Sequence, residues 1–447
     1  MDNRLAFMDQ ASFLGLRATG QGQTIQCVWV YQRPIDLDAL RRFNRNLGYG
    51  LLGRRIERSP LPFARHRWVS CRAPLDIDVA ECARPRGELS AWADERGQLP
   101  VDPERGPGWH LGVLPFTDGS AAISLAASHT VVDGGGFCLA VADAVRGDTR
   151  DLGYPPPASR TRRRAVIEDA HQTAQGVPEI VRTLRAAAKL ARRRRREFSR
   201  AQPSLPVEAA DNTADADEAV IVPAITIYVD VDDWDARAYS LGGTSNSLLA
   251  GFTAKLAEHA ERRRRRDGAV NLSFPVSDRE EGDVRANALA FADVTVDPAC
   301  VTTDLGSVRA AVKQTLKTLR ETPDESLQLL PLTPLTPKRA VKRLAEVAFG
   351  YDELPVGCSN LGDIDPAVAC PDGAEADQVF MRLVEQYTTR ASLQRTRGIL
   401  YVASGRIVDK VFLTVAAYQL DRKNSKSYLR QLAACTLADF ELVGAID

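Results

Sequence analysis

One short stretch combines a histidine, an acid and three glycines between two apolar segments. His129 is followed by Asp133 and then by Gly134, Gly135 and Gly136, and the chain holds only five histidines. An imidazole can accept and return a proton near neutral pH, because its unperturbed pKa is about 6.5. Glycines let a substrate approach the backbone and its N–H groups closely. The stretch therefore predicts a general base at His129, with Asp133 as an anchor that holds the loop.

The same stretch allows other interpretations. A His and an Asp four residues apart could form half of a metal site, but no second histidine lies nearby, so we expect no metal. Ser128 and His129 do not suggest a hydrolase triad, because neighbouring strand residues point to opposite faces. The glycines match neither common phosphate-loop pattern. A lone histidine in a turn at a strand end is more often a satisfied polar residue than a catalyst, so this structural alternative for His129 stays open.

Two apolar segments must position this stretch. Residues 121–127 precede it and predict a buried strand, and residues 137–145 follow it and predict a helix that begins near Gly136. Residues 109–115 predict a neighbouring strand, joined to the first by a turn at 117–119. His129 therefore lies at a strand-to-helix junction, a place where a rigid scaffold often positions functional groups.

The rest of the chain mixes strand-like and helix-like segments, which predicts an α+β fold. Further strands are predicted at 24–31, 219–231, 270–276, 288–296, 379–385, 398–403 and 408–418, and extended segments at 60–68 and 74–79. Helices are predicted within 1–20, from Asp36 or Asp38, and at 89–95, 163–200 with a break near 176–178, 244–262, 305–321, 338–349 and 427–434, and a Pro/Thr loop at 331–337.

The composition is that of an ordinary globular protein. Apolar residues make up 44% and charged residues 26% of the 447 residues, and the formal net charge is zero, which argues against nucleic acid as a partner. No apolar run approaches the ~18–20 residues of a transmembrane helix, and the N-terminus lacks the apolar segment of a signal peptide. The eight cysteines are scattered without a C-x-x-C pair, which favours free thiols in a reducing compartment. We expect a cytoplasmic protein.

Residues 201–218 predict a linker, because they are rich in Pro, Ala and acids and offer little to bury. The linker would separate an N-terminal lobe, residues 1–200, which carries the His129 stretch and connecting helices, from a C-terminal lobe, residues 219–447. Runs of arginine occur at 192–196 and 262–266. They predict either solvated helix ends or docking sites for the phosphates of a ligand or for an acidic partner.

The stretch from His129 to Gly134 matches the H-x-x-x-D-G signature of the chloramphenicol-acetyltransferase-like superfamily. This group includes condensation domains of nonribosomal peptide synthesis, wax ester synthase/diacylglycerol acyltransferases, plant alcohol acyltransferases and mycobacterial polyketide-associated acyltransferases. Ser128 stands where many members carry a second histidine, which weakens an assignment to the peptide-condensing branch.

Other segments resemble the same families in the same order along the chain. The resemblance is nearest to the wax ester synthase/diacylglycerol acyltransferase and polyketide-associated branches. The segments are 37–40 (LDAL), 109–113 (WHLGV), 244–250 (TSNSLLA), 274–279 (FPVSDR) with the pair Asn287-Ala288, and 356–362 (VGCSNLG).

The resemblance implies two lobes, each a mixed sheet flanked by helices, with a tunnel between them and a late segment near 352–390 that crosses back over the N-terminal lobe. It implies catalytic roles for His129, Asp133 and Gly134, and an ion pair between Asp133 and Arg279. The supporting residues would be Arg279, Gly135 and Asn287, and the residues expected to line the tunnel are Ser359 and Asn360.

The implied activity is transfer of an acyl group from a thioester to a hydroxyl or amine, with His129 as general base. Acyl-CoA or a phosphopantetheine thioester would be a co-substrate, and no cofactor would be bound permanently. The partners would be a small-molecule donor and acceptor, with an acyl or peptidyl carrier protein as a further partner. The alternatives are a condensation enzyme that depends on a carrier protein, and a non-catalytic binding member of the family.

Overall fold

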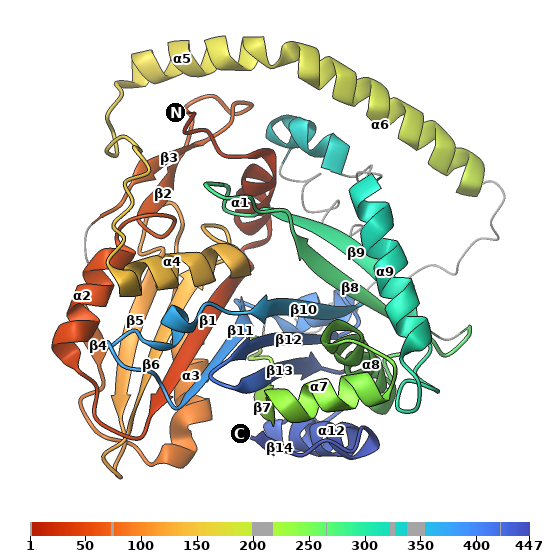
Figure 1. Cartoon of the computed structure of the whole chain (residues 1–447). Coiled ribbons are helices and arrows are strands. Elements are labelled where there is room, and N and C mark those ends of the chain that lie inside the picture. Colours follow the sequence, from red (N-terminus) through yellow and green to blue (C-terminus); the bar gives the residue numbers. More distant parts are fainter. Residues whose placement is uncertain are drawn as a thin grey trace.

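The computed structural model describes residues 2–72, 76–198, 218–264, 266–321, 327–337, 354–420 and 422–447. Its strands form two large mixed sheets and a small antiparallel pair, with helices packed against the large sheets, in two lobes that lie side by side (Figure 1). The chain therefore has the α+β, two-lobed architecture predicted for it.

The helices flank the sheets and supply the connections. They are α1 (Phe7–Thr19), α2 (Leu37–Leu47), α3 (Leu89–Gly97), α4 (Gly134–Arg146), α5 (Arg162–Gln175), α6 (Val177–Phe198), α7 (Val231–Ser240), α8 (Ser245–His259), α9 (Gly306–Glu321), α11 (Arg390–Arg395) and α12 (Lys426–Asp439), with 3-10 helices η1 (Arg86–Glu88), η2 (Leu327–Leu335) and η3 (Pro366–Ala369). The strands are β1 (Gly22–Tyr31), β2 (Arg54–Glu57), β3 (Arg67–Ser70), β4 (Asp78–Val79), β5 (Trp109–Pro115), β6 (Ala121–Ser128), β7 (Ala224–Asp230), β8 (Val270–Ser277), β9 (Leu289–Val296), β10 (Val356–Asp363), β11 (Gln378–Gln386), β12 (Ile399–Ile407), β13 (Lys410–Tyr418) and β14 (Gly444–Ile446).

The first sheet has five strands in the order β11-β1-β6-β5-β4. Strand β1 pairs antiparallel with β6 on one side and with β11 on the other, so a strand from late in the chain completes the sheet of the first lobe. All residues of β6 are buried, because its small and apolar side chains lie between neighbouring strands and covering helices. This buried strand carries the chain directly to His129.

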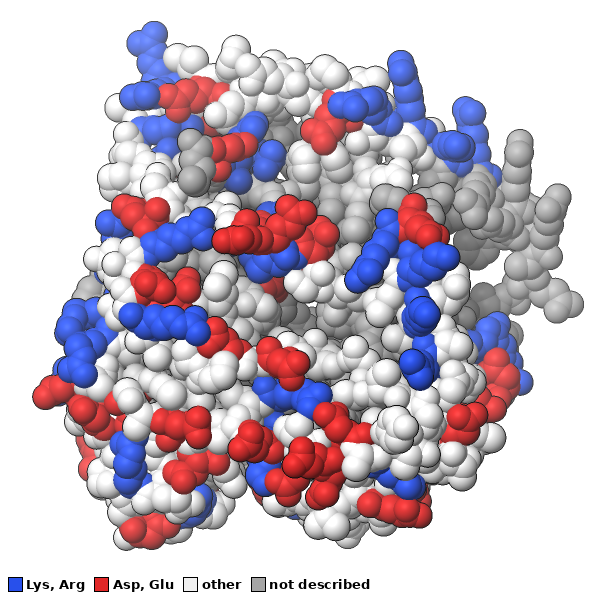
Figure 2. Space-filling model, viewed as in Figure 1, with Lys and Arg blue, Asp and Glu red and all other residues white. Residues whose placement is uncertain are grey.

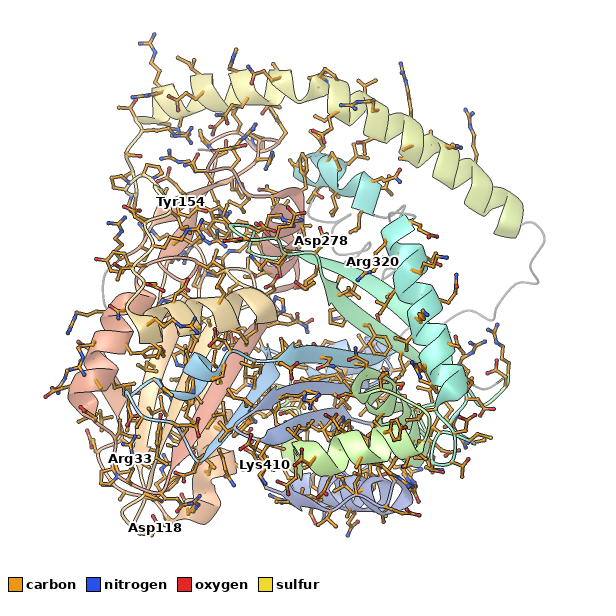
Figure 3. All side chains as sticks on the ribbon, viewed as in Figure 1. Arg33, Asp118, Tyr154, Asp278, Arg320 and Lys410 are labelled. Carbon is orange, nitrogen blue, oxygen red and sulfur yellow. The ribbon has the colours of Figure 1, made fainter. Side chains whose placement is uncertain are left out.

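The second sheet has seven strands in the order β14-β7-β13-β12-β10-β8-β9. Strand β10 is parallel to β12 and β8, whereas the outer pairs are antiparallel, so the sheet is mixed. Strands β8 and β9 pair with each other, and the connection between them extends toward α1 of the first lobe (Figure 1). Asp278, which is labelled in Figure 3, lies in that connection. Ala286, in the same connection, is fully buried within the core of the first lobe.

Most of the predicted elements are present, with shifts of a few residues at their ends. The strand and helix on either side of His129 are confirmed as β6 and α4, and α4 begins two residues earlier than predicted, at Gly134. The break in the long helical stretch is confirmed between Gln175 and Val177. Strong local patterns therefore identified the elements that position the motif.

Several expectations were wrong. Residues 60–68 were expected to be extended, but the chain turns there, with the N–H of Ala64 donating to the carbonyl of Leu61, and only the last two residues enter β3. The strand predicted at 219–231 begins only at Ala224, because Pro223 precedes it, and ends where α7 starts. Residues 331–337 are mostly part of the 3-10 helix η2 instead of a loop.

Other predictions lie outside the described residues or stay untested. The helix expected at 338–349 and most of the linker expected at 201–218 fall outside the described ranges, so the division into lobes of residues 1–200 and 219–447 stays a prediction. Among the helices within the described ranges, none is both long and apolar enough to cross a membrane.

Candidate active site

His129 lies directly after β6, in the turn that leads into α4. Its backbone N–H donates to the carbonyl of Gln23 at 2.9 Å, which continues the pairing of β6 with β1. The turn closes with a hydrogen bond from the N–H of Val131 to the carbonyl of Ser128, also at 2.9 Å. Two buried elements thus hold His129 from both sides.

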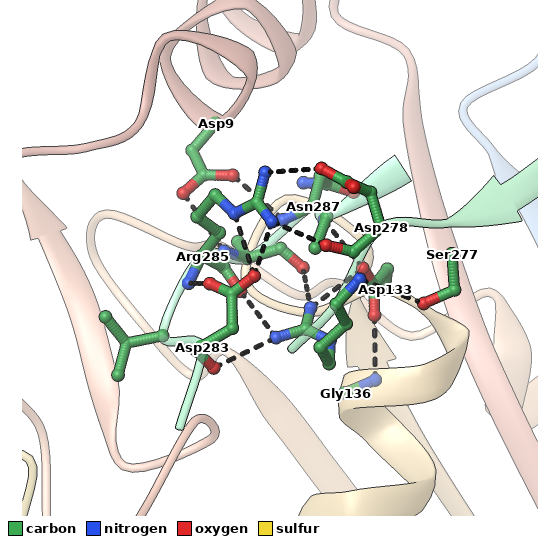
Figure 4. Close-up of polar contacts among 12 residues, drawn as sticks. Asp9, Asp133, Gly136, Ser277, Asp278, Asp283, Arg285 and Asn287 are labelled. Atoms are coloured by element: carbon green, nitrogen blue, oxygen red, sulfur yellow. Dashed lines mark hydrogen bonds and ion pairs between the residues drawn. The ribbon is translucent and has the colours of Figure 1, made fainter. Parts of the chain in front are cut away.

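Asp133 is the N-cap of α4 and the centre of the polar contacts around the motif. One carboxylate oxygen accepts from the N–H of Gly136 at 2.7 Å, as expected for an Asp at this helix position. The other accepts from Nη2 of Arg279 and from the N–H of Ala288, both at 2.8 Å (Figure 4). The side chain is almost fully buried, so these bonds offset the cost of removing its charge from water.

Arg279 comes from the connection between β8 and β9 and organises that connection. Its Nη1 donates to the carbonyl oxygens of Asp283 and Arg285 at 3.2 and 3.1 Å, and its Nη2 donates to the carbonyl of Ala286 at 3.2 Å. The carboxylate of Asp283 in turn accepts from the guanidinium of Arg285 (Figure 4). The ion pair of Arg279 with Asp133 therefore fixes a whole loop of the second lobe against the motif.

The environment of His129 keeps its ring neutral near neutral pH. Burial lowers the pKa of His129, and the ring's hydrogen bond to its own backbone, the charge of Asp133 and hydrogen bonding to Asn287 oppose this shift. The residue keeps partial exposure to solvent. A neutral imidazole has one nitrogen that can accept a proton, so the lowered pKa is compatible with a role as a base.

Asn287 is the neighbour of His129 from the second lobe. Its amide Nδ2 donates to the carbonyl oxygen of His129 at 3.3 Å. The backbone N–H groups on either side, of Ala286 and Ala288, bind the carboxylates of Asp9 and Asp133. The structure thus brings together His129, Asp133, Arg279 and Asn287 from two lobes.

The glycines of the motif differ in the space around them. A methyl group on Gly134 would come within 2.8 Å of Cδ2 of Leu361, whereas one on Gly135 would meet nothing nearer than 3.8 Å. Leu361 belongs to β10, in the segment that contains Ser359 and Asn360. The segment therefore reaches the motif through Leu361.

The contacts of Asn360 lie at the end of β10. The side chain of Asn360 binds Asn246 in the first turn of α8 and accepts from the N–H of Gly362 at 2.9 Å. These contacts shape the end of β10, and neither of them involves His129. A role for Ser359 and Asn360 in lining a tunnel stays a prediction.

Two buried charged residues at this junction were not singled out from the sequence. Asp9, in the first turn of α1, accepts from the N–H groups of Ala286 and Asn287 at 3.0 and 2.8 Å. Arg54, in β2, donates to the carbonyl of Val131 at 3.0 Å and to that of Val284. Nothing local distinguishes either from a surface residue, because their partners lie far away in the sequence.

Two residues of the arginine run at 262–266, Arg262 and Arg263, make contacts within the fold. Arg262 is mostly enclosed, burial lowers its pKa to about 10, and it donates to the carbonyl of Arg397 at 2.8 Å. Arg263 pairs with Glu258 at 2.9 Å. These contacts favour a structural interpretation of this run. On the face shown in Figure 2, cations and anions are interspersed.

A cavity of about 220 Å³ lies between α1, α5, α6 and η2. Its lining includes Phe7, Gln172, Glu179 and Leu335, and it includes none of the predicted site residues. The tunnel implied for the His129 site therefore stays a prediction.

Comparisons with known proteins concern the fold. No protein-family model matches the chain, and a search of curated proteins gives no match either. The first condensation domain of the calcium-dependent antibiotic synthetase superposes with a TM-score of 0.59 at 14% identity, covering 98% of this chain and 96% of that one. Polyketide synthase associated protein 5 from Mycobacterium tuberculosis gives 0.54 at 14% identity, covering 97% of each chain.

A third structure, trichothecene 15-O-acetyltransferase from Fusarium sporotrichioides, gives a TM-score of 0.57 at 10% identity and covers 98% of this chain and 94% of that one. Each of these three differently named proteins superposes on this chain over nearly its whole length. The chain therefore has the chloramphenicol-acetyltransferase-like fold of condensation domains and acyltransferases.

Proposed function

We propose that this protein is an acyltransferase that moves an acyl group from a thioester to a hydroxyl or amine, with His129 as the general base. The observation that supports it most is that contacts from the second lobe hold the motif, through Arg279 on Asp133 and Asn287 on the carbonyl of His129, around a histidine of intermediate exposure. The fold supports the same class, because condensation domains and an acetyltransferase share it.

In the proposed reaction, His129 removes the proton from the acceptor as the acceptor attacks the thioester carbonyl carbon. The new C–O or C–N bond gives a tetrahedral oxyanion, whose collapse breaks the C–S bond. The leaving thiolate takes the proton that His129 held, so the ring returns to its neutral form. Orientation of both substrates supplies much of the rate gain.

The motif offers candidates for stabilising the oxyanion. Gly134 and Gly135 begin α4, where a helix leaves N–H groups without partners inside the helix and carries the positive end of its dipole. N–H groups aimed at a developing oxyanion contribute strongly to catalysis. Asp133 and Arg279 would act as the scaffold that keeps this turn in place, and Asn287 would orient His129.

The donor is acyl-CoA or an acyl group on the phosphopantetheine of a carrier protein, and no permanently bound cofactor is part of the proposal. Donor and acceptor would meet in a tunnel between the proposed lobes, residues 1–200 and 219–447. Ser359 and Asn360 would contribute to its wall. We place the reaction in the cytoplasm.

A product screen tests this proposal. The full chain is mixed with a panel of acyl-CoA thioesters, and in parallel with acyl-carrier proteins, in the presence of alcohol and amine pools. Release of free thiol and a new mass, both lost in His129→Ala, are the expected result. Activity only with carrier-bound donors would assign a carrier-dependent condensation enzyme. Product formation at an unchanged rate in His129→Ala would overturn His129 as the base, and no product from any pair would favour a binding protein.

A further inference from the structure

Asp9 is a fully buried carboxylate on a helix outside the motif. It is 0% exposed, in the first turn of α1. Burial raises its pKa, and hydrogen bonds from the N–H groups of Ala286 and Asn287 and the charge of Arg54 oppose that shift. A carboxylate in such a position is costly unless its hydrogen bonds are well formed, so the loop that supplies those N–H groups must hold one conformation.

Three successive N–H groups of that loop bind two carboxylates of the other lobe. The N–H groups of Ala286 and Asn287 donate to Asp9 at 3.0 and 2.8 Å, and the N–H of Ala288 donates to Asp133 at 2.8 Å (Figure 4). The carbonyl of Ala286 accepts from the N–H of Asp133, also at 2.8 Å. Asn287 is therefore held between two fixed points on the first lobe.

The side chain of Asn287 connects this loop to the proposed base. It donates to the backbone carbonyl of His129 at 3.3 Å, and its hydrogen bonding raises the pKa of the His129 ring. The position of Asn287 thus bears on the backbone of His129 and on the protonation of its ring.

We propose that Asp9 is a positioning residue for His129, acting through Asn287. The carboxylate fixes the backbone of Asn287, and the fixed amide holds the backbone carbonyl of His129, and with it the residue that carries the ring. The inference rests on the proposed function only in treating His129 as the base. The contacts among Asp9, Asn287 and His129 are present whatever the reaction is.

The test measures the ring directly and needs no substrate. The pKa of the His129 ring is measured by a pH titration of its NMR signal in the full chain, which is labelled at its five histidines. The His129 signal is assigned as the one that is missing from His129→Gln. Because bonding to Asn287 raises the pKa of His129, Asp9→Asn and Asn287→Ala should each lower it. In the double variant the shift should be no larger than in Asn287→Ala alone.

The matched control is Asp372→Asn. Asp372 is also a buried carboxylate, 3% exposed, that accepts from Arg33 and from the N–H of Asp36, but it lies outside the contacts around His129. This variant should lose stability and keep the wild-type pKa of His129. If Asp9→Asn does not fold, Asp9→Ser replaces it, because a water can fit between the shorter side chain and the two N–H groups.

Two results would overturn the inference. One is a wild-type His129 pKa in folded Asp9→Asn or Asp9→Ser. The other is an additive shift in the double variant, since Asp9 would then act on the ring through its charge. This outcome is independent of the product screen. If the pKa of His129 shifts as expected in a protein that transfers no acyl group, the positioning role of Asp9 holds and the acyltransferase proposal is rejected.

Discussion

Asp133 and Arg279 lie 146 positions apart in the sequence and form an ion pair of 2.8 Å whose side chains are 1% and 9% exposed. Asp133 caps the helix that follows His129, and Arg279 organises the loop that carries Asn287. A buried ion pair gains little net stability over apolar residues, but breaking it leaves a charge without a partner. The pair therefore acts mainly to fix the geometry of two loops from different parts of the chain.

Removal of only one partner of this ion pair should lower the free energy of unfolding strongly, because the other charge stays buried. Asp133→Ala leaves the buried guanidinium of Arg279 without its counter-charge and two N–H groups without their acceptor, so the free energy of unfolding should fall by about 3–5 kcal/mol. Arg279→Ala should cost a similar amount, and the double variant less than the sum of the two. Chemical unfolding of the four proteins measures this, and we expect activity to be lost in all three variants.

The control for this cycle is the exposed pair of Asp38 and Arg41, whose side chains are 79% and 59% exposed. Asp38→Ala should change stability by no more than about 1 kcal/mol. Strict additivity of the two buried substitutions would show that Asp133 and Arg279 do not depend on each other.

The rate of acyl transfer should depend on pH through His129. The base must be neutral, so the rate falls as the pH drops through the pKa of the ring. Because burial lowers that pKa, the acid limb of kcat/KM should have its midpoint below the usual value of 6.5. The profile should be the same with two acceptors of different pKa, and a midpoint at or above 6.5 would contradict the assignment.

The elements around His129 could be predicted because their signals are local. The apolar run of β6, the helix of α4 and the break before Val177 each follow from neighbouring residues. The chloramphenicol-acetyltransferase-like fold, in contrast, was suggested by a resemblance of several short segments, since no periodicity specifies which strands pair. Strand β10 was not predicted, because its small polar residues have low strand propensity and pairing with β8 and β12 decides its structure.

The contacts that complete the site are long-range and could not be read from sequence patterns. Asp9 lies 277 positions before Ala286, whose N–H it accepts, and Arg54 lies 77 positions before Val131, to whose carbonyl it donates. An acid in the first turn of a helix is most simply a surface residue that favours the helix dipole. Only the folded chain shows that this carboxylate is buried against Ala286.

Acid should destabilise the protein through its buried histidines. Burial lowers the pKa of His66 and of His110 to about 4. Between pH 6.5 and 4 the unfolded chain therefore binds protons that the folded chain does not. The free energy of unfolding is therefore highest, as far as these two rings affect it, above pH 6.5. It falls as the pH drops toward 4, by up to about 3 kcal/mol for each ring.

Urea unfolding at pH 7 and pH 5 measures this loss. His66→Gln should reduce the difference in the free energy of unfolding between pH 7 and pH 5, because glutamine cannot take up the proton. The control is His171→Gln, at an exposed position of α5, which should keep the wild-type difference. An unchanged difference in His66→Gln would show that this ring does not contribute.

The three glycines of the motif should differ in their tolerance of a methyl group. At Gly136 a Cβ would lie 3.0–3.1 Å from Val132, Arg279 and Asp133, so Gly136→Ala must displace the buried ion pair and should cost about 1–3 kcal/mol. At Gly134 the only close atom is Cδ2 of Leu361 at 2.8 Å, the end of a side chain that can move, so Gly134→Ala should cost less. At Gly135 the nearest atom is 3.8 Å away, and Gly135→Ala should stay within about 0.5 kcal/mol of the wild type.

The Leu361→Ala background separates the crowding at Gly134 from any effect on the backbone. If contact with Leu361 is the cause, Gly134→Ala should cost less stability in Leu361→Ala than in the wild type, whereas the cost of Gly136→Ala should be the same in both. Thermal or chemical unfolding of these variants gives the order of costs. An equal cost for Gly134→Ala in both backgrounds would place its origin in the backbone of α4, and a tolerated Gly136→Ala would show that the ion pair is not closely packed against the motif.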